Sequence, residues 1–144
     1  MATLVVNGLI ELENDFSKIA EIPDSVMENM INAETDVIVA AQKKKAKTML
    51  RGKYNRGYVE RAIKKKKFKR SYFGASQMIT IDGTVTDEYH RKPTRVAEIA
   101  FINEYGKEGQ PARPFIRTAN EESGDKAVQA AFDVYDQFLK SKNL

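Results

Sequence analysis

The spacing of apolar residues in the first third of the chain predicts two helices. In residues 9–22 large apolar side chains recur every three or four positions, and Pro23 ends this first helix. A short extended segment, Thr3–Val6, precedes it. Asp24 then caps a second helix that continues to Leu50 and is about 40 Å long at 1.5 Å per residue. Because this exceeds the usual width of a domain of this size, we expect the helix to project or to lie against something beyond its own core, which favours an oligomer.

Shorter elements are predicted in the middle of the chain. Residues 51–70 contain two glycines and a short helix around Tyr58–Lys65. Further on, Asp82-Gly83 separates two runs rich in β-branched residues, and such a pair is a strong signal for a β-hairpin. A polar loop, residues 87–93, follows this hairpin.

The last third of the chain predicts two further helices joined by a connector. Thr94 caps the first of them, and Gly106 ends it. Glu121 and Glu122 are expected in the first turn of the C-terminal helix, whose apolar stripe consists of Val128, Ala131, Phe132, Tyr135, Phe138 and Leu139. These elements predict an α+β fold in which long N-terminal helices and a C-terminal helix pack on a small antiparallel sheet. No repeat or linker divides the chain, so we expect a single domain, residues 1–144.

The composition excludes several kinds of chemistry. The 144 residues include one histidine and no cysteine, so the chain has no disulfide, no cysteine-bound metal and no thiol nucleophile. His90 lies in the polar loop and is expected to be a surface residue rather than a general base. Residues 52–57 are not followed by the Lys-Ser or Lys-Thr of a phosphate loop, and Met78 replaces the second glycine of a nucleophile elbow. We therefore expect no enzymatic activity, no cofactor and no metal ion.

The sequence has no segment suited to crossing a membrane. Its longest purely apolar run, Val37–Ala41, is far shorter than the roughly 20 residues that a membrane helix needs. The first ten residues lack the basic start of a secretory signal, and Glu11 comes before any cleavage pattern. We therefore expect a protein that is assembled in the cytoplasm and does not bind membranes.

The charges are strongly segregated along the chain. Residues 1–42 carry eight acids and one cation, whereas residues 43–70 carry fourteen cations and one acid. Such a basic segment repels itself unless something negative lies near it. It is interpreted as a solvated helix face with a mobile loop, as a binding surface for nucleic-acid phosphates, or as a contact with acidic surfaces of neighbouring subunits. The candidate residues for contact with DNA or with an acidic partner are Lys43, Lys44, Lys45, Lys47, Lys64, Lys65, Lys66, Lys67, Lys69 and Arg70.

Two prolines three positions apart shape the connector before the last helix. Pro111 and Pro114 each fix their own φ and push the preceding residue into an extended conformation, so the connector is stiff. We expect it to aim Phe115 at the core and to leave Arg113 and Arg117 free to meet carboxylates. A rigid turn that introduces the last helix would explain the prolines equally well, but it would not explain the arginine between them.

The stretch from Ala97 to Arg117 resembles a known protein family. It reads Ala97-x-x-Ala100-Phe101-x-x-Glu104-Tyr105-Gly106, and after a short loop Pro111-Ala112-Arg113-Pro114-Phe115-Ile116-Arg117. This pattern is similar to that of the small tail-completion or head-tail joining proteins of tailed bacteriophages and prophages, in which a glutamate, an aromatic residue and a glycine precede a similar Arg-Pro-Phe element. The expected order of elements also agrees with that family, whereas the basic run Lys64–Lys67 is not part of the resemblance.

The resemblance implies a structural virion protein of the phage neck or tail, without catalytic activity. Such a protein forms a homo-oligomeric ring, sixfold or twelvefold, between a connector or head-completion protein and a tail-terminator or tail-tube protein. The residues expected to contact a neighbouring subunit or partner are Glu104, Tyr105, Arg113, Phe115 and Arg117. In a ring, the acidic block of one subunit could face the basic block of the next, or the basic block could line the channel through which genomic DNA passes.

An alternative function is sequence-nonspecific nucleic-acid binding through residues 43–70. This segment and its edge contain five aromatic residues, which can stack on bases but which fill a core more often: Tyr54, Tyr58, Phe68, Tyr72 and Phe73. No zinc finger, RNA-recognition signature or recognition helix accompanies them, so contacts would be with phosphates. Tight, salt-sensitive DNA binding by a monomer would favour this alternative, whereas assembly into rings would favour the neck protein.

Overall fold

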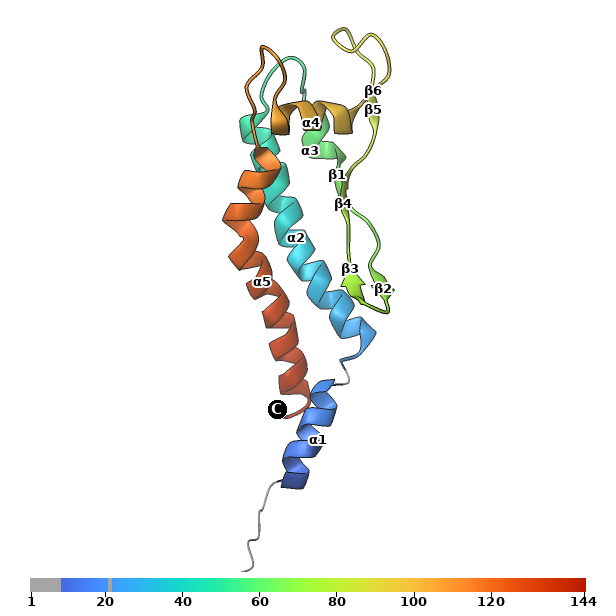
Figure 1. Ribbon diagram of the computed structural model, residues 1–144, viewed down its shortest axis with the longest axis vertical. Helices are drawn as coiled ribbons and strands as arrows, with labels where there is room; N and C mark the ends of the chain where they lie inside the picture. Colours follow the sequence, from blue (N-terminus) through green and yellow to red (C-terminus); the bar gives the residue numbers. More distant parts are fainter. Residues whose placement is uncertain (1–8, 21) are drawn as a thin grey trace, which may run out of the picture.

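Two long helices, α2 (Asp24–Met49) and α5 (Phe115–Ser141), form the body of the molecule (Figure 1). The computed structural model describes residues 9–20 and 22–144, so the expected extended segment Thr3–Val6 lies outside the described residues. The other helices are α1 (Leu9–Ala20), α3 (Tyr58–Ala62) and α4 (Val96–Tyr105). The strands are β1 (Ile63–Lys65), β2 (Lys69–Ser71), β3 (Gly74–Ser76), β4 (Ile79–Ile81), β5 (Thr84–Val85) and β6 (Thr94–Arg95).

Small and polar side chains let α2 and α5 lie close together along their length. The buried positions are Thr35, Gln42 and Ala46 on α2 and Phe115, Ala119, Ser123, Ala127 and Phe138 on α5. The Gln42 side-chain amide donates a hydrogen bond of 2.9 Å to the Asn120 side-chain oxygen across the pair. The two helices have 26 and 27 residues, so α5 covers the length of α2 within the same chain. The length of α2 therefore does not by itself require a second subunit, which removes one of the arguments from the sequence for an oligomer.

The strands form three separate two-stranded antiparallel ladders instead of one sheet. β1 pairs with β4, β2 with β3, and β5 with β6. In Figure 1 these ladders follow the side of α2 that faces away from α5, and α1 lies beyond the other end of the helix pair from α4. The predicted α+β class is confirmed, with the antiparallel strands reduced to these short pieces.

The hydrophobic core lies at the end of the molecule where α2 finishes and α5 begins. Here α3, α4 and the first strands meet the two long helices, and the buried core cluster comprises Ala46, Leu50, Val59, Ala62, Ile63, Val85, Val96, Ile99, Ala100 and Phe115. Phe115, Val59 and Ile63 are fully buried. Most of the buried apolar side chains are therefore concentrated at one end, and Phe138 is the large apolar side chain that is buried in the far half of α5.

The prediction of a β-hairpin at Asp82-Gly83 is wrong. Both flanking runs are extended, but β4 pairs with β1 and β5 pairs with β6. The Asp82 N–H donates to the Ala62 carbonyl and the Gly83 carbonyl accepts from the Val96 N–H, so these two residues continue the ladders instead of reversing the chain.

Several predicted helix boundaries also shift. The helix expected over Tyr58–Lys65 ends at Ala62, because Ile63 is extended and starts β1. Thr94 does not cap α4: it belongs to β6, and Arg95 precedes the helix without a side-chain cap. Gly106 follows the end of α4 as expected. The last helix begins directly after Pro114, earlier than the turn around Glu121 that its charges suggested.

Candidate functional site

Glu104 connects the end of α4 to the beginning of α5. Its Oε2 accepts a hydrogen bond of 2.8 Å from the Ile116 backbone N–H, and its Oε1 accepts one of 3.0 Å from the Arg117 N–H. The first N–H groups of a helix have no partner inside the helix, and a negative charge is favourable there. Glu104 is only 8% exposed, so its carboxylate holds two helices of the same chain together.

The connector between these helices, residues 106–114, is held in place by its backbone. Gly106 has a φ of 78°, and a Cβ at this position would lie 2.8 Å from the Ala112 backbone nitrogen, so only glycine fits. The Arg113 N–H donates to the Asn103 carbonyl at 2.5 Å. Phe115 is fully buried at the end of the connector, as the two prolines predicted.

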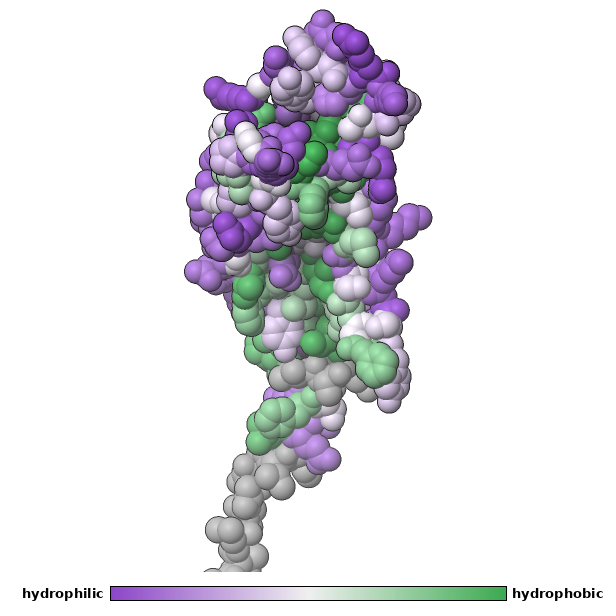
Figure 2. Space-filling model, turned by 45° about the horizontal axis from the view of Figure 1, so that its top comes forward, coloured by the Kyte–Doolittle hydropathy of each residue, from purple (hydrophilic) through white to green (hydrophobic). Residues whose placement is uncertain are grey.

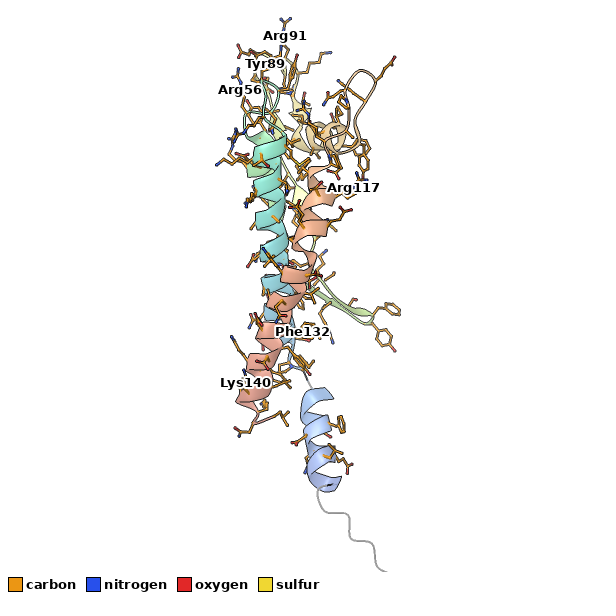
Figure 3. The ribbon with its side chains drawn as sticks, turned by 90° about the vertical axis from the view of Figure 1, so that its left-hand side faces the viewer. Arg56, Tyr89, Arg91, Arg117, Phe132 and Lys140 are labelled. Carbon is orange, nitrogen blue, oxygen red and sulfur yellow. The ribbon has the colours of Figure 1, made fainter. Side chains whose placement is uncertain are left out.

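The expected contact residues of this motif divide into two groups. Glu104 and Phe115 lie inside the chain, where a partner would not reach them, because the backbone N–H groups of α5 and the core already occupy their side chains. Tyr105 is 69% exposed, and its ring lies 4.7 Å from that of Phe101, centre to centre. Arg113 and Arg117 are also exposed. Figure 3 shows Arg117 on the first part of α5. Contact with a partner thus stays a prediction for Tyr105, Arg113 and Arg117.

Part of the basic segment 43–70 is neutralised by acids of the same chain. In the part of the chain that the structure describes, five ion pairs involve it: Lys45–Glu122, Arg56–Glu88, Lys65–Asp36, Lys66–Asp82 and Arg70–Asp24. Two of these, to Asp24 and Asp36, join the basic segment to the acidic block of residues 1–42 within one chain. Each pair is partly exposed and contributes little to stability by itself. The two blocks therefore compensate each other in part without a neighbouring subunit.

The remaining lysines of the candidate set are exposed. Among the described residues none of them forms an ion pair with a carboxylate: Lys43, Lys44, Lys47, Lys64, Lys67 and Lys69. The first three lie on the second half of α2, and the others lie on or beside β1 and β2. The unpaired lysines of the segment thus lie in two separate places and do not form a single basic face.

His90 is not the exposed loop residue that the sequence suggested. Its side chain is 11% exposed, and its Nδ1 lies 2.9 Å from Asp87 Oδ1. Asp87 also accepts hydrogen bonds from the Tyr58 hydroxyl at 2.7 Å and from the backbone N–H groups of Tyr89 and His90. These hydrogen bonds, that of Tyr58 first, hold the pKa of Asp87 well below its usual range. The cluster fixes the loop of residues 87–93 against α3.

This cluster predicts a dependence of stability on acidic pH. A carboxylate whose pKa is lower in the folded state contributes stability above its unfolded pKa, near 4, and this contribution is lost as the pH falls toward the folded value. We therefore expect the melting temperature of the wild type to exceed that of Asp87→Asn at neutral pH, and the difference to shrink below about pH 4. Thermal unfolding followed by circular dichroism between acidic and neutral pH measures both. A difference that stays constant down to the lowest pH would contradict the assigned role of Asp87.

A hollow of about 740 Å³ lies beside the connector, at the loop end of the molecule. Its floor includes Leu50 and Ile99 from the core, and its polar lining includes four cations: Arg51, Lys53, Lys107 and Arg113. Only Arg51 and Lys53 belong to the basic segment, and neither was among the candidate residues. The sequence did not show that these four cations lie together, because separate loops contribute them, and Arg113 was expected only as a contact to a partner. The signal in the sequence that could have indicated these residues is a cation next to a loop glycine, as at Gly52 and Gly106.

Neither a metal site nor similarity to a known protein points to a function. Among the described residues, no group of three or more histidine or acidic side chains is placed to hold a metal ion. Within the same residues, no helix combines the length and apolar character needed to cross a bilayer. Comparison with protein-family models, curated sequences and solved structures gave no match for this chain. The phage-protein resemblance therefore depends on the motif Ala97–Arg117 itself.

Proposed function

We propose that this chain is a structural subunit of a homo-oligomeric ring at the head-tail junction of a tailed phage or phage-like particle. The proposal that the chain assembles is based on two separate apolar patches, which lie on the half of the molecule away from the hydrophobic core. The resemblance of the segment Ala97–Arg117 to tail-completion proteins carries the location.

The first patch is the tip of the β2–β3 hairpin, and the second is a ridge on α5. The hairpin tip consists of Tyr72 and Phe73, which are both 96% exposed and lie 5.2 Å apart, ring centre to ring centre. The α5 ridge consists of Val128 and Phe132, one helical turn apart and 48% and 57% exposed. Figure 2 shows hydrophobic residues gathered over this half of the molecule. Exposed aromatic side chains of this size are typical of interaction surfaces.

The two patches suit contact between copies of the chain. In Figure 3 the hairpin projects from the helix pair near the height of Phe132. The exposed cations Lys67 and Lys69 lie at the base of the hairpin, and exposed Asp125 and Asp133 lie beside the α5 ridge, so the surroundings of the two patches have opposite charges. A tip that packs on the ridge of the next copy makes a head-to-tail contact, and such contacts close into a ring when the rotation between copies allows it.

A substitution on the ridge tests the assembly. Phe132→Glu is expected to convert rings into folded monomers, because it places a charge where an apolar side chain of the next copy would pack. Size-exclusion chromatography with light scattering measures the mass, and electron microscopy shows whether rings form.

Gln137→Glu is the matched control, since it introduces the same residue at an exposed position of the same helix. This control should assemble as the wild type does. A wild-type protein that stays monomeric at every concentration would contradict the proposed assembly. Absence of the protein from the neck of particles labelled with a specific antibody would contradict the proposed location.

A further inference from the structure

The loop end of the molecule is strongly cationic. Three loops meet there, residues 50–57, 87–95 and 106–114, and together they carry eight cations and three acids. Figure 2 shows this end covered by hydrophilic residues, and Figure 3 shows Arg56 and Arg91 beside Tyr89 at the same end. Glu88 is already paired with Arg56, and Asp87 is held by Tyr58 and His90. The excess positive charge at this end is thus largely uncompensated.

The hollow beside the connector gathers part of this charge. Among the described residues, Lys53, Lys107 and Arg113 form no ion pair with a carboxylate, and Glu98 is the one acid that lines the hollow. The backbone holds these cations together, since the loops of Lys107 and Arg113 are fixed by hydrogen bonds to Gln110 and Asn103. Like charges that line one hollow repel one another, so the site favours an anion.

The cationic surface extends beyond this hollow. A second hollow of about 300 Å³ shares Arg51 with the first, and its lining adds two cations, Lys47 and Arg56, and one acid, Glu60. Exposed Lys43 and Lys44 continue the cations along α2. A surface of this extent suits a polyanion with repeated charges better than one small anion.

Aromatic rings stand among these cations. Tyr54 and Tyr89 are 55% and 39% exposed, with their ring centres 5.5 Å apart in an edge-to-face arrangement. The Lys53 ammonium lies 5.0 Å from the Tyr54 centroid and 5.6 Å from that of Tyr89. Exposed aromatic rings beside cations are typical of surfaces that bind single-stranded nucleic acids, where the rings stack on bases and the cations contact phosphates.

The acids of a second copy suit this surface less well. The main acidic block of the chain, residues 1–42, already gives two of its eight acids, Asp24 and Asp36, to cations of its own chain, and Glu122 on α5 is paired with Lys45. The backbone of a nucleic acid, in contrast, carries one charge at every phosphate along its length.

We propose that the loop end binds the phosphate backbone of nucleic acid without sequence preference, through Arg51, Lys53, Lys107 and Arg113. This site is distinct from the hairpin tip and the α5 ridge, which carry the proposed assembly. It also differs from the block of residues 43–70 that the charge pattern indicated, because half of its cations come from the connector after α4.

Fluorescence anisotropy with a labelled DNA duplex of mixed sequence tests the proposal on the full chain. The wild type should bind, and its affinity should fall steeply between about 50 and 200 mM salt. The triple variant Lys53→Gln, Lys107→Gln, Arg113→Gln should bind about tenfold more weakly or worse at low salt. The slope of log affinity against log salt should become shallower by about 2–3, because each lost phosphate contact removes nearly one unit. All three side chains are exposed, and circular dichroism checks that the variant remains folded.

The matched control removes three exposed charges from α5 and the residue that follows it: Lys126→Gln, Lys140→Gln, Lys142→Gln. It should retain affinity within about threefold of the wild type, since these residues lie away from the loop end. No binding of the wild type at low salt, an equal loss in both triple variants, or tighter binding of labelled polyglutamate than of the duplex would each overturn the proposal. The Phe132→Glu monomer should still bind DNA, so the test is independent of assembly. A wild type that binds the duplex but never forms rings contradicts the proposed function and supports this site.

Discussion

Replacing Phe115 by alanine is expected to lower the free energy of unfolding by about 3–5 kcal/mol. Phe115 is fully buried in the core where α2 ends and α5 begins, beside Leu50 and Ala46. Removal of its ring would leave a cavity that the neighbouring side chains cannot fill, because the backbone around α4 and the connector is fixed by hydrogen bonds. Urea unfolding followed by circular dichroism measures the change.

Phe132→Ala is the control for this experiment, because it removes the same ring from an exposed position of the same helix. At a protein concentration where the chain is monomeric, it should change the free energy of unfolding by about 1 kcal/mol or less. Equal effects of the two substitutions would contradict the assignment of Phe115 to the core.

Two helix boundaries could be predicted because their signals are local. Pro23 separates α1 from α2, and Gly106 follows α4, as the sequence indicated. The pairing of the strands could not be predicted in this way, because β4 finds its partner β1 on an earlier part of the chain. An Asp-Gly pair favours a turn, but the backbone groups of these residues bond to Ala62 and Val96 instead.

The charge pattern predicted that the basic segment needs negative groups nearby, but it did not predict which groups these are. A count along the chain shows that acidic and basic blocks exist, but only the fold shows that Lys65 and Arg70 reach Asp36 and Asp24 of the same chain. The sequence did not predict that the cations of the hollow lie together for the same reason, since Lys53 and Arg113 are far apart along the chain. His90 was placed at the surface because its neighbours are polar, whereas those neighbours fold around it.

Glu104→Ala is expected to lower the free energy of unfolding by about 2–3 kcal/mol. The substitution removes the carboxylate that accepts the backbone N–H groups of Ile116 and Arg117, so these donors at the start of α5 lose their partner. It also removes the negative charge that the positive end of the helix dipole favours. Urea unfolding of the wild type and the variant gives the difference.

Glu108→Ala is the control, because it removes the same charge from an exposed position of the neighbouring loop and should be nearly neutral. The two variants separate the two roles that sequence and structure give to Glu104. If it holds α5 in place, Glu104→Ala loses stability in the monomer, and any loss of assembly follows from that. If it contacts a partner instead, the monomer keeps its stability and only assembly fails. The second result would contradict the geometry, in which both carboxylate oxygens already have partners inside the chain.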